Sequence, residues 1–180
     1  MSWQDICSTI NNVFNIVFIA MGDAVAIIVG KYLGAGDMKK ARDADNKIIA
    51  TAIFSAILFG GLMLITAPFF PQIYNTTDKA KLIATHFIIV QALFMPKDAF
   101  LHTSYFTIRA GGNTVITFLF DSVFMICVSV PLAFILAHFT TLGAAVIFAI
   151  VHGADFIKCI IGYILVKRGG WLKNLTENNI

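Results

Sequence analysis

Ionisable side chains interrupt several long apolar runs of this sequence, where a charge is costly and therefore informative. They are Asp23, Lys97, Asp98, Asp121, Asp155 and Lys158. At the centre of a bilayer each would cost about 3 kcal/mol if it were unpaired. We therefore expect most of them to face the interior of a helix bundle or a wet cavity. Carboxylates in such places can bind and release cations or protons.

The most informative of these groups surrounds Asp98. Asp98, His102 and Tyr105 are spaced i, i+4 and i+7, which places them on one face of a helix. Pro96 removes a backbone hydrogen bond and frees the carbonyl of Ala92 one turn earlier. A carboxylate beside a freed carbonyl predicts a cation or proton site. The alternative is a structural ion pair with Lys97 or with another helix; we favour the functional interpretation for Asp98 and leave both open for Lys97.

The other buried acids are more ambiguous. Asp155 and Lys158 are three residues apart, so they can pair within one helix. An interior structural pair is the favoured interpretation there, and a role of Asp155 in ion coupling is the alternative. For Asp121, a polar gate contact and a helix-packing contact are equally open.

A polar stripe occupies the first apolar run. Asn12, Asn15 and Asp23 lie within roughly 80° of one another at ~100° per residue. The stripe faces either a cavity that receives substrate or a neighbouring helix.

The sequence carries no pattern typical of common enzymes. It has no Gly-rich phosphate loop and no CxxC, HExxH or GxSxG motif. The four histidines are too scattered for a metal site, and the three cysteines suggest no disulfide framework. We therefore expect neither catalysis nor a bound metal or organic cofactor.

The composition excludes most soluble classes. Hydrophobic residues make up 58% of the 180 residues, and only 13% are charged, where a soluble domain carries roughly 25%. A soluble chain of this composition would expose large aggregating patches. Disordered chains and nucleic-acid-binding proteins are excluded by the same figures, which indicate an all-α integral membrane protein.

Five segments are long enough to cross ~30 Å of hydrocarbon, which takes about 20 helical residues. They are 9–32, 48–70, 82–108, 115–137 and 142–166. The opening residues lack the basic region of a secretory signal, so we expect the first span to be retained.

The basic residues predict the orientation. They gather in the link 33–47, at Arg109 and in the tail 167–180. By the positive-inside rule these regions are cytoplasmic, which places the C-terminus inside and the N-terminus outside the plasma (inner) membrane.

Four short motifs, in order, resemble one family. Residues 29–42 (VGKYLGAGDMKKAR) resemble a VGxxLGAGDxxxAR signature, and 108–114 (IRAGGNT) an RxGG(D/N)T turn. Residues 130–133 (VPLA) match a PLA run. Residues 155–158 (DFIK), followed by Gly170 and Trp171, resemble a closing (E/D)xxK and GxW pattern. The family is that of the multidrug and toxic compound extrusion (MATE) efflux transporters.

The resemblance implies a twelve-helix antiporter of two six-helix lobes, which exports cationic or amphipathic drugs against a Na⁺ or H⁺ gradient. In many members an acidic residue lies eleven positions before the arginine of the RxGG turn, which here is Asp98. Residues 1–180 resemble a partial C-terminal lobe that lacks its first helix. The implied partners are the lipid bilayer and an N-terminal lobe or a second copy.

Two alternatives stay open. One is a polysaccharide or lipid exporter of the same superfamily, a flippase-like protein for which a cationic groove would be typical. The other is a truncated remnant that transports nothing and whose inner charges merely pair.

Overall fold

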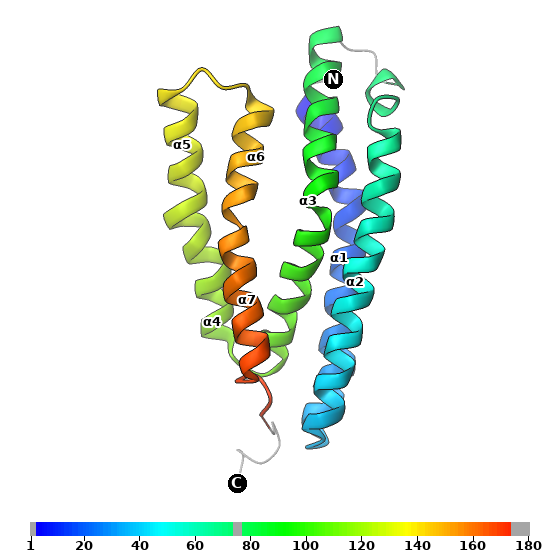
Figure 1. The fold of residues 1–180 in the computed structure, drawn as a ribbon, viewed down its shortest axis with the longest axis vertical. Coiled ribbons are helices and arrows are strands. Elements are labelled where there is room, and N and C mark those ends of the chain that lie inside the picture. The colour runs from blue at the N-terminus through cyan, green and yellow to red at the C-terminus, as the bar shows by residue number, and fades with distance from the viewer. Residues whose placement is uncertain (1–2, 74–76, 174–180) are drawn as a thin grey trace.

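The computed structural model describes the backbone of residues 3–73 and 77–173, and the side chains in these ranges except at 3–11, 13–15, 17 and 18. Within these residues, helical rods run alongside one another (Figure 1). The first rods are α1 (Trp3–Gly34), α2 (Met38–Thr66) and α3 (Asp78–Ala110), with a 3₁₀ turn, η1 (Phe70–Ile73), between α2 and α3.

Two further rods are each built from shorter pieces. The fourth consists of α4 (Thr114–Phe118), the π-helical segments η2 (Leu119–Val123) and η3 (Met125–Ser129), and α5 (Val130–Phe139). The fifth consists of α6 (Ala144–Ala154) and α7 (Phe156–Arg168), which Asp155 separates. The sequence predicted an unbroken helix in both places, so the π-helical turns and the break at Asp155 are new features.

Four helices of the described part are long and apolar enough to cross a membrane. They are Met38–Thr66, Asp78–Ala110, Thr114–Phe139 and Ala144–Arg168. The second predicted span, 48–70, ends earlier than expected, because the helix stops at Thr66, just before Pro68. The first predicted span, 9–32, falls in α1, where many side chains lie outside the described residues, so a fifth span stays a prediction.

Local sequence signals explain where the helices begin. Gly36 adopts a positive φ of 73° after α1, a conformation that glycine adopts without strain. Asp37 then caps α2, because its Oδ1 accepts a hydrogen bond from the Lys40 backbone N–H at 3.1 Å. The Lys40 ammonium also lies 2.8 Å from Asp37 Oδ2. These hydrogen bonds from Lys40 lower the pKa of Asp37 below its usual value. Thr77 caps α3 in the same way.

Helix α3 is the central element of the bundle. It packs against α1, α2, α6 and α7. Its contact with α2 is made largely of small side chains, which let the two backbones approach closely. The buried members of that contact are Ala52, Ala56, Met63, Ala67, Ala84, Ile88, Ala92, Met95 and Ala99.

A second apolar cluster lies at the end of the bundle where α1 ends and α2 begins. It consists of Val25, Val29, Leu33, Ala41 and Trp171, and we call it the Trp171 cluster. Because Trp171 follows α7, this cluster ties the end of the last rod to the first two.

Candidate functional site

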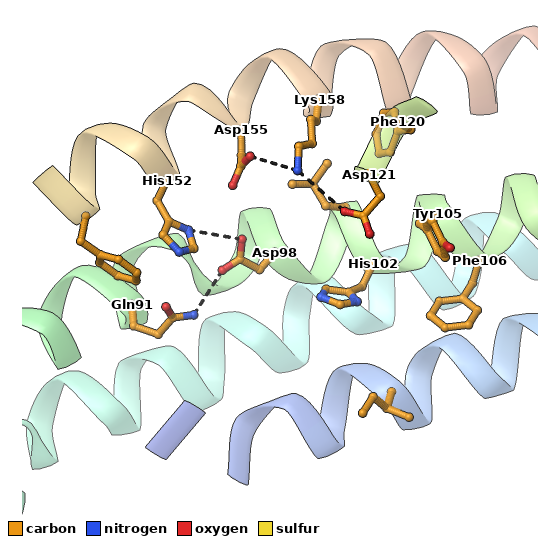
Figure 2. A pocket seen from close by; sticks show the side chains of 13 residues that line it. Gln91, Asp98, His102, Tyr105, Phe106, Phe120, Asp121, His152, Asp155 and Lys158 are labelled. Carbon is orange, nitrogen blue, oxygen red and sulfur yellow. Dashed lines mark hydrogen bonds and ion pairs between the residues drawn. The ribbon is translucent and has the colours of Figure 1, made fainter. Parts of the chain in front are cut away.

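A cavity of approximately 490 Å³ lies between α1, α3 and the two composite rods (Figure 2). It is lined by Ile19, Gln91, Asp98, Leu101, His102, Tyr105, Phe106, Phe120, Asp121, Phe148, His152, Asp155 and Lys158. The wall therefore combines aromatic rings with acidic, basic and amide groups, a mixture that suits an amphipathic ligand.

One wall of the cavity is a polar stripe along α3. Gln91, Asp98, His102 and Tyr105 recur at spacings of seven, four and three residues, so they share one face of the helix. Gln91 Nε2 donates a hydrogen bond to Asp98 Oδ2 at 3.3 Å. This contact holds the Asp98 carboxylate toward the cavity.

The ammonium of Lys97 connects α3 to the fifth rod. The Lys97 side chain is only 4% exposed, and its Nζ lies 2.8 Å from Asp98 Oδ1 and 3.5 Å from Asp155 Oδ2. Nζ also donates a hydrogen bond to the backbone carbonyl of His152 at 3.2 Å. Lys97 therefore forms a structural ion pair and also belongs to the charged network of the cavity. The structure is compatible with both the structural and the functional interpretation of this residue.

The break in the fifth rod explains why charges gather beside it. The last carbonyls of α6 carry the negative end of the helix dipole, and that of His152 accepts a hydrogen bond from the Asp155 backbone N–H at 3.3 Å. Lys97 binds one of them, that of His152. Asp155 occupies the N-cap position of α7, where the helix dipole favours a negative charge.

Lys158 extends the network toward the fourth rod. Its Nζ lies 3.2 Å from Asp155 Oδ1 and 3.9 Å from Asp121 Oδ1. The same ammonium stands 4.9 Å from the centre of the Phe124 ring, a cation–π distance. Asp121 belongs to the π-helical segment η2, and its side chain is 66% exposed.

The charges of the cavity nearly cancel. Two ammonium groups (Lys97 and Lys158) face three carboxylates (Asp98, Asp121 and Asp155), which leaves one negative charge when the histidines are neutral. Each carboxylate already has an ammonium within 4 Å. A cation that enters must therefore compete with a lysine for its carboxylate.

The sequence-predicted residues fall into two groups. The cavity is lined by Asp98, His102, Tyr105, Asp121 and Asp155. Lys97 does not line it, but its ammonium forms ion pairs with Asp98 and Asp155. The two remaining residues are not placed there. Asp23 is exposed and does not line the cavity, and the side chain of Asn15 lies outside the described residues.

Some lining residues were not among the predicted site residues. Gln91 stands seven residues before Asp98 on the same stripe, so its spacing was a usable signal. His152 stands three residues before Asp155, so its spacing was also a usable signal, and Lys158 was expected only as the ion-pair partner of Asp155. The aromatic residues Phe120 and Phe148 come from other rods and carry no such signal.

The carbonyl freed by Pro96 does not open into the cavity. A Cβ on Gly60 of α2 would stand 2.9 Å from the Ala92 carbonyl oxygen, so Gly60 covers it. Ala92 itself is buried in the contact between α2 and α3. The prediction that this carbonyl stands beside Asp98 is therefore wrong, because it faces the neighbouring helix.

In the described part of the chain, no group of three His, Cys, Asp or Glu side chains is arranged to hold a metal ion.

Comparison with known proteins places the chain. The sequence profile of the MatE family matches residues 4–135. Multidrug and toxin extrusion protein 1 of Homo sapiens is 25% identical over 168 residues, which covers 87% of this chain and 29% of the human protein. The protein of the same name from Pongo abelii is 24% identical over 168 residues. The chain thus spans about 29% of the length of these relatives, and no solved structure matches it. Because the profile covers more than half of the chain, and four helices of its described part are long and apolar enough to span a bilayer, the chain is a multi-pass membrane protein of the MatE family.

Proposed function

We propose that this chain is part of a transporter that exports cationic or amphipathic drugs and couples their export to the entry of Na⁺ or H⁺. The observation that carries the proposal is the cavity, in which Asp98, Asp121 and Asp155 stand among aromatic side chains between apolar helices. The aromatic rings suit the apolar part of such a drug, and the carboxylates suit its charge.

The shared ion pairs provide a mechanism that couples drug binding to the binding of a proton or Na⁺. Asp98 shares the Lys97 ammonium with Asp155, and Asp155 shares Lys158 with Asp121. When a proton, Na⁺ or a cationic drug binds one of these carboxylates, the lysine that it displaces shifts toward the next. Two ligands that each displace a lysine from one network compete with each other, as antiport requires.

The net charge of the cavity bears on the alternative substrates. One negative charge remains among its five charged groups, which disfavours an anionic lipid-linked sugar and favours a cation. We therefore prefer drug export to the flippase-like function.

The proposal also includes the membrane in which the chain lies and its orientation there. We place it in the plasma (inner) membrane with the basic end, where α1 ends and α7 ends, in the cytoplasm. The opposite wall of the transport cleft would come from a second lobe, which is either an N-terminal lobe or another copy of this chain.

The Asp98→Asn variant tests the proposed function in a transporter that contains this chain. We expect it to abolish gradient-driven efflux of a cationic dye from cells, because a neutral amide neither binds a cation nor takes up a proton. Its amount in the membrane should stay normal. Dye accumulation and the membrane content of the transporter are measured together.

Asp78→Asn is the matched control, since Asp78 is an exposed acid in the first turn of the same helix. Its efflux should equal that of the wild type. Undiminished efflux by the Asp98→Asn variant would remove Asp98 from the coupling role.

A further inference from the structure

A fully buried carboxylate lies apart from the cavity. Asp45 in α2 is fully buried, at 0% exposure. On its own helix it stands between Ala41, a member of the Trp171 cluster, and Ile48, which packs against that cluster. Its partner Thr107 is nine residues beyond Asp98 on α3, which is about 13 Å along the helix axis. Asp45 is therefore separate from the proposed transport site.

The hydrogen bonds around Asp45 cannot all form while it is ionised. Thr107 Oγ1 lies 2.5 Å from Asp45 Oδ1 and 2.9 Å from the backbone carbonyl oxygen of Thr103. A hydroxyl has a single hydrogen, so Thr107 can donate to only one of these two acceptors. Asp45 Oδ2 is buried and has no hydrogen-bond partner among the described residues. An ionised Asp45 would thus carry a buried charge with a hydrogen bond at Oδ1 only, which is costly.

A proton on Asp45 resolves this conflict. The Asp45 carboxylic acid then donates to Thr107 Oγ1, and the Thr107 hydroxyl donates to the Thr103 carbonyl. Both short contacts become hydrogen bonds, and no buried charge remains in the apolar surroundings.

The charged groups on the elements around Asp45 do not neutralise it. Within the described residues none forms an ion pair with it, and Arg42, one turn earlier on α2, donates instead to the Lys167 backbone carbonyl. Lys31 on α1 and Arg109 on α3 are exposed. Tyr32, which packs against the Trp171 cluster from α1, is a titratable side chain on that side.

We propose that Asp45 is a proton-binding site that fastens α2 to α3 near the end of the bundle. It holds a proton while the two helices are packed as in this structure. When their ends separate, water reaches the carboxyl, the proton passes to that water, and the carboxylate remains hydrated. The packing of this end of the bundle thereby becomes sensitive to pH.

Infrared spectroscopy of the full chain in lipid nanodiscs tests the proposal directly. At mildly acidic pH we expect a carboxylic-acid C=O stretching band that shifts in D₂O. The Asp45→Asn variant should lose one carboxylic-acid equivalent from this band. Asp43→Asn is the matched control, because Asp43 is exposed two residues away on the same helix, and this variant should keep the full band. An unchanged band in Asp45→Asn would overturn the proposal.

A second variant keeps the test decisive if Asp45→Asn fails to fold. Thr107→Val removes the acceptor of the Asp45 proton, so the C=O band of the acid should move to higher frequency and stay present. A band with the wild-type position in Thr107→Val would count against the proposed hydrogen bond and so against the site. Neither measurement depends on transport, so the result is independent of the proposed function.

Discussion

Lys97 contacts more polar partners than a lysine at an exposed surface normally does. Its ammonium binds Asp98, Asp155 and the carbonyl of His152, and its side chain is almost completely buried. A buried charge of this kind depends on its partners, and the partners depend equally on it.

Lys97→Met therefore removes a charge that two carboxylates share. We expect the variant to lose about 3–5 kcal/mol of unfolding free energy, the usual cost of breaking a buried ion pair from one side. Unfolding of the chain in mixed micelles by increasing amounts of SDS measures this change. Lys40→Met is the control, because Lys40 pairs with Asp37 in an exposed position, where water screens the ion pair and its loss should cost far less than that of Lys97. Equal losses in the two variants would contradict the inferred role of Lys97.

Single residues of the site were predictable as far as one helix determines them. Asp98, His102 and Tyr105 share a face because of their spacing alone, and the structure places all three on the cavity. The contact between Lys97 and the carbonyl of His152 was not predictable. It depends on how α3 and α6 are rotated toward each other and on a helix end that the sequence does not mark.

At the scale of elements, the contact between α2 and α3 shows how a proline can be accommodated in a long helix. Pro96 lies inside α3, and the helix continues through it. The freed carbonyl of Ala92 is covered by Gly60, whose missing side chain leaves room for it. The glycine on α2 thus leaves the space that the carbonyl freed by the proline on α3 occupies.

Gly60→Ala tests this packing. The added Cβ would lie 2.9 Å from the Ala92 carbonyl oxygen, so the backbones must move apart. We expect a loss of about 1–3 kcal/mol, typical of an overpacked contact. Gly61→Ala is the matched control, because nothing lies within 4 Å of its Cβ position and alanine favours a helix. Thermal unfolding in detergent compares the two, and a Gly60→Ala variant as stable as Gly61→Ala would contradict the close approach.

The composite rods show where prediction from the sequence reached its limit. Hydropathy located the apolar runs 115–137 and 142–166, and helices able to span a membrane occupy both. It could not show that η2 and η3 are π-helical, since apolar composition is the same in either helix type. Pro131 is a local cause of the π-helical turn in η3. Proline has no backbone N–H, so the α-helical hydrogen bond from residue 131 to the Cys127 carbonyl is missing.

At the scale of the whole molecule, the helices differ in how much they bury. In the apolar 18-residue stretch of each helix, 22% of the residues are buried in α2 and 33% in α3. The corresponding shares are 6% in the fourth rod and 0% in the fifth. The fifth rod contacts the rest chiefly through α3. Trp171, which follows the rod, adds an anchor at the end of the bundle.

Trp171→Ala should therefore loosen the attachment of the fifth rod. The Trp171 side chain is 1% exposed, and removing a buried tryptophan costs about 3–5 kcal/mol. Phe134→Ala is the comparison at an exposed aromatic residue of α5, which is 65% exposed. There we expect a change within about 0.5 kcal/mol. Limited proteolysis after α7 would detect the loosening, and equal cleavage of both variants would argue against the anchor.

The outward faces of the fourth and fifth rods also affect how this sequence can change over generations. Lipid tails demand apolar side chains but impose no particular shape on them. We therefore expect homologues to exchange leucine, isoleucine, phenylalanine and valine freely along these faces. The alanine and glycine positions between α2 and α3 should change far more slowly, because there a single methyl group meets a neighbouring backbone.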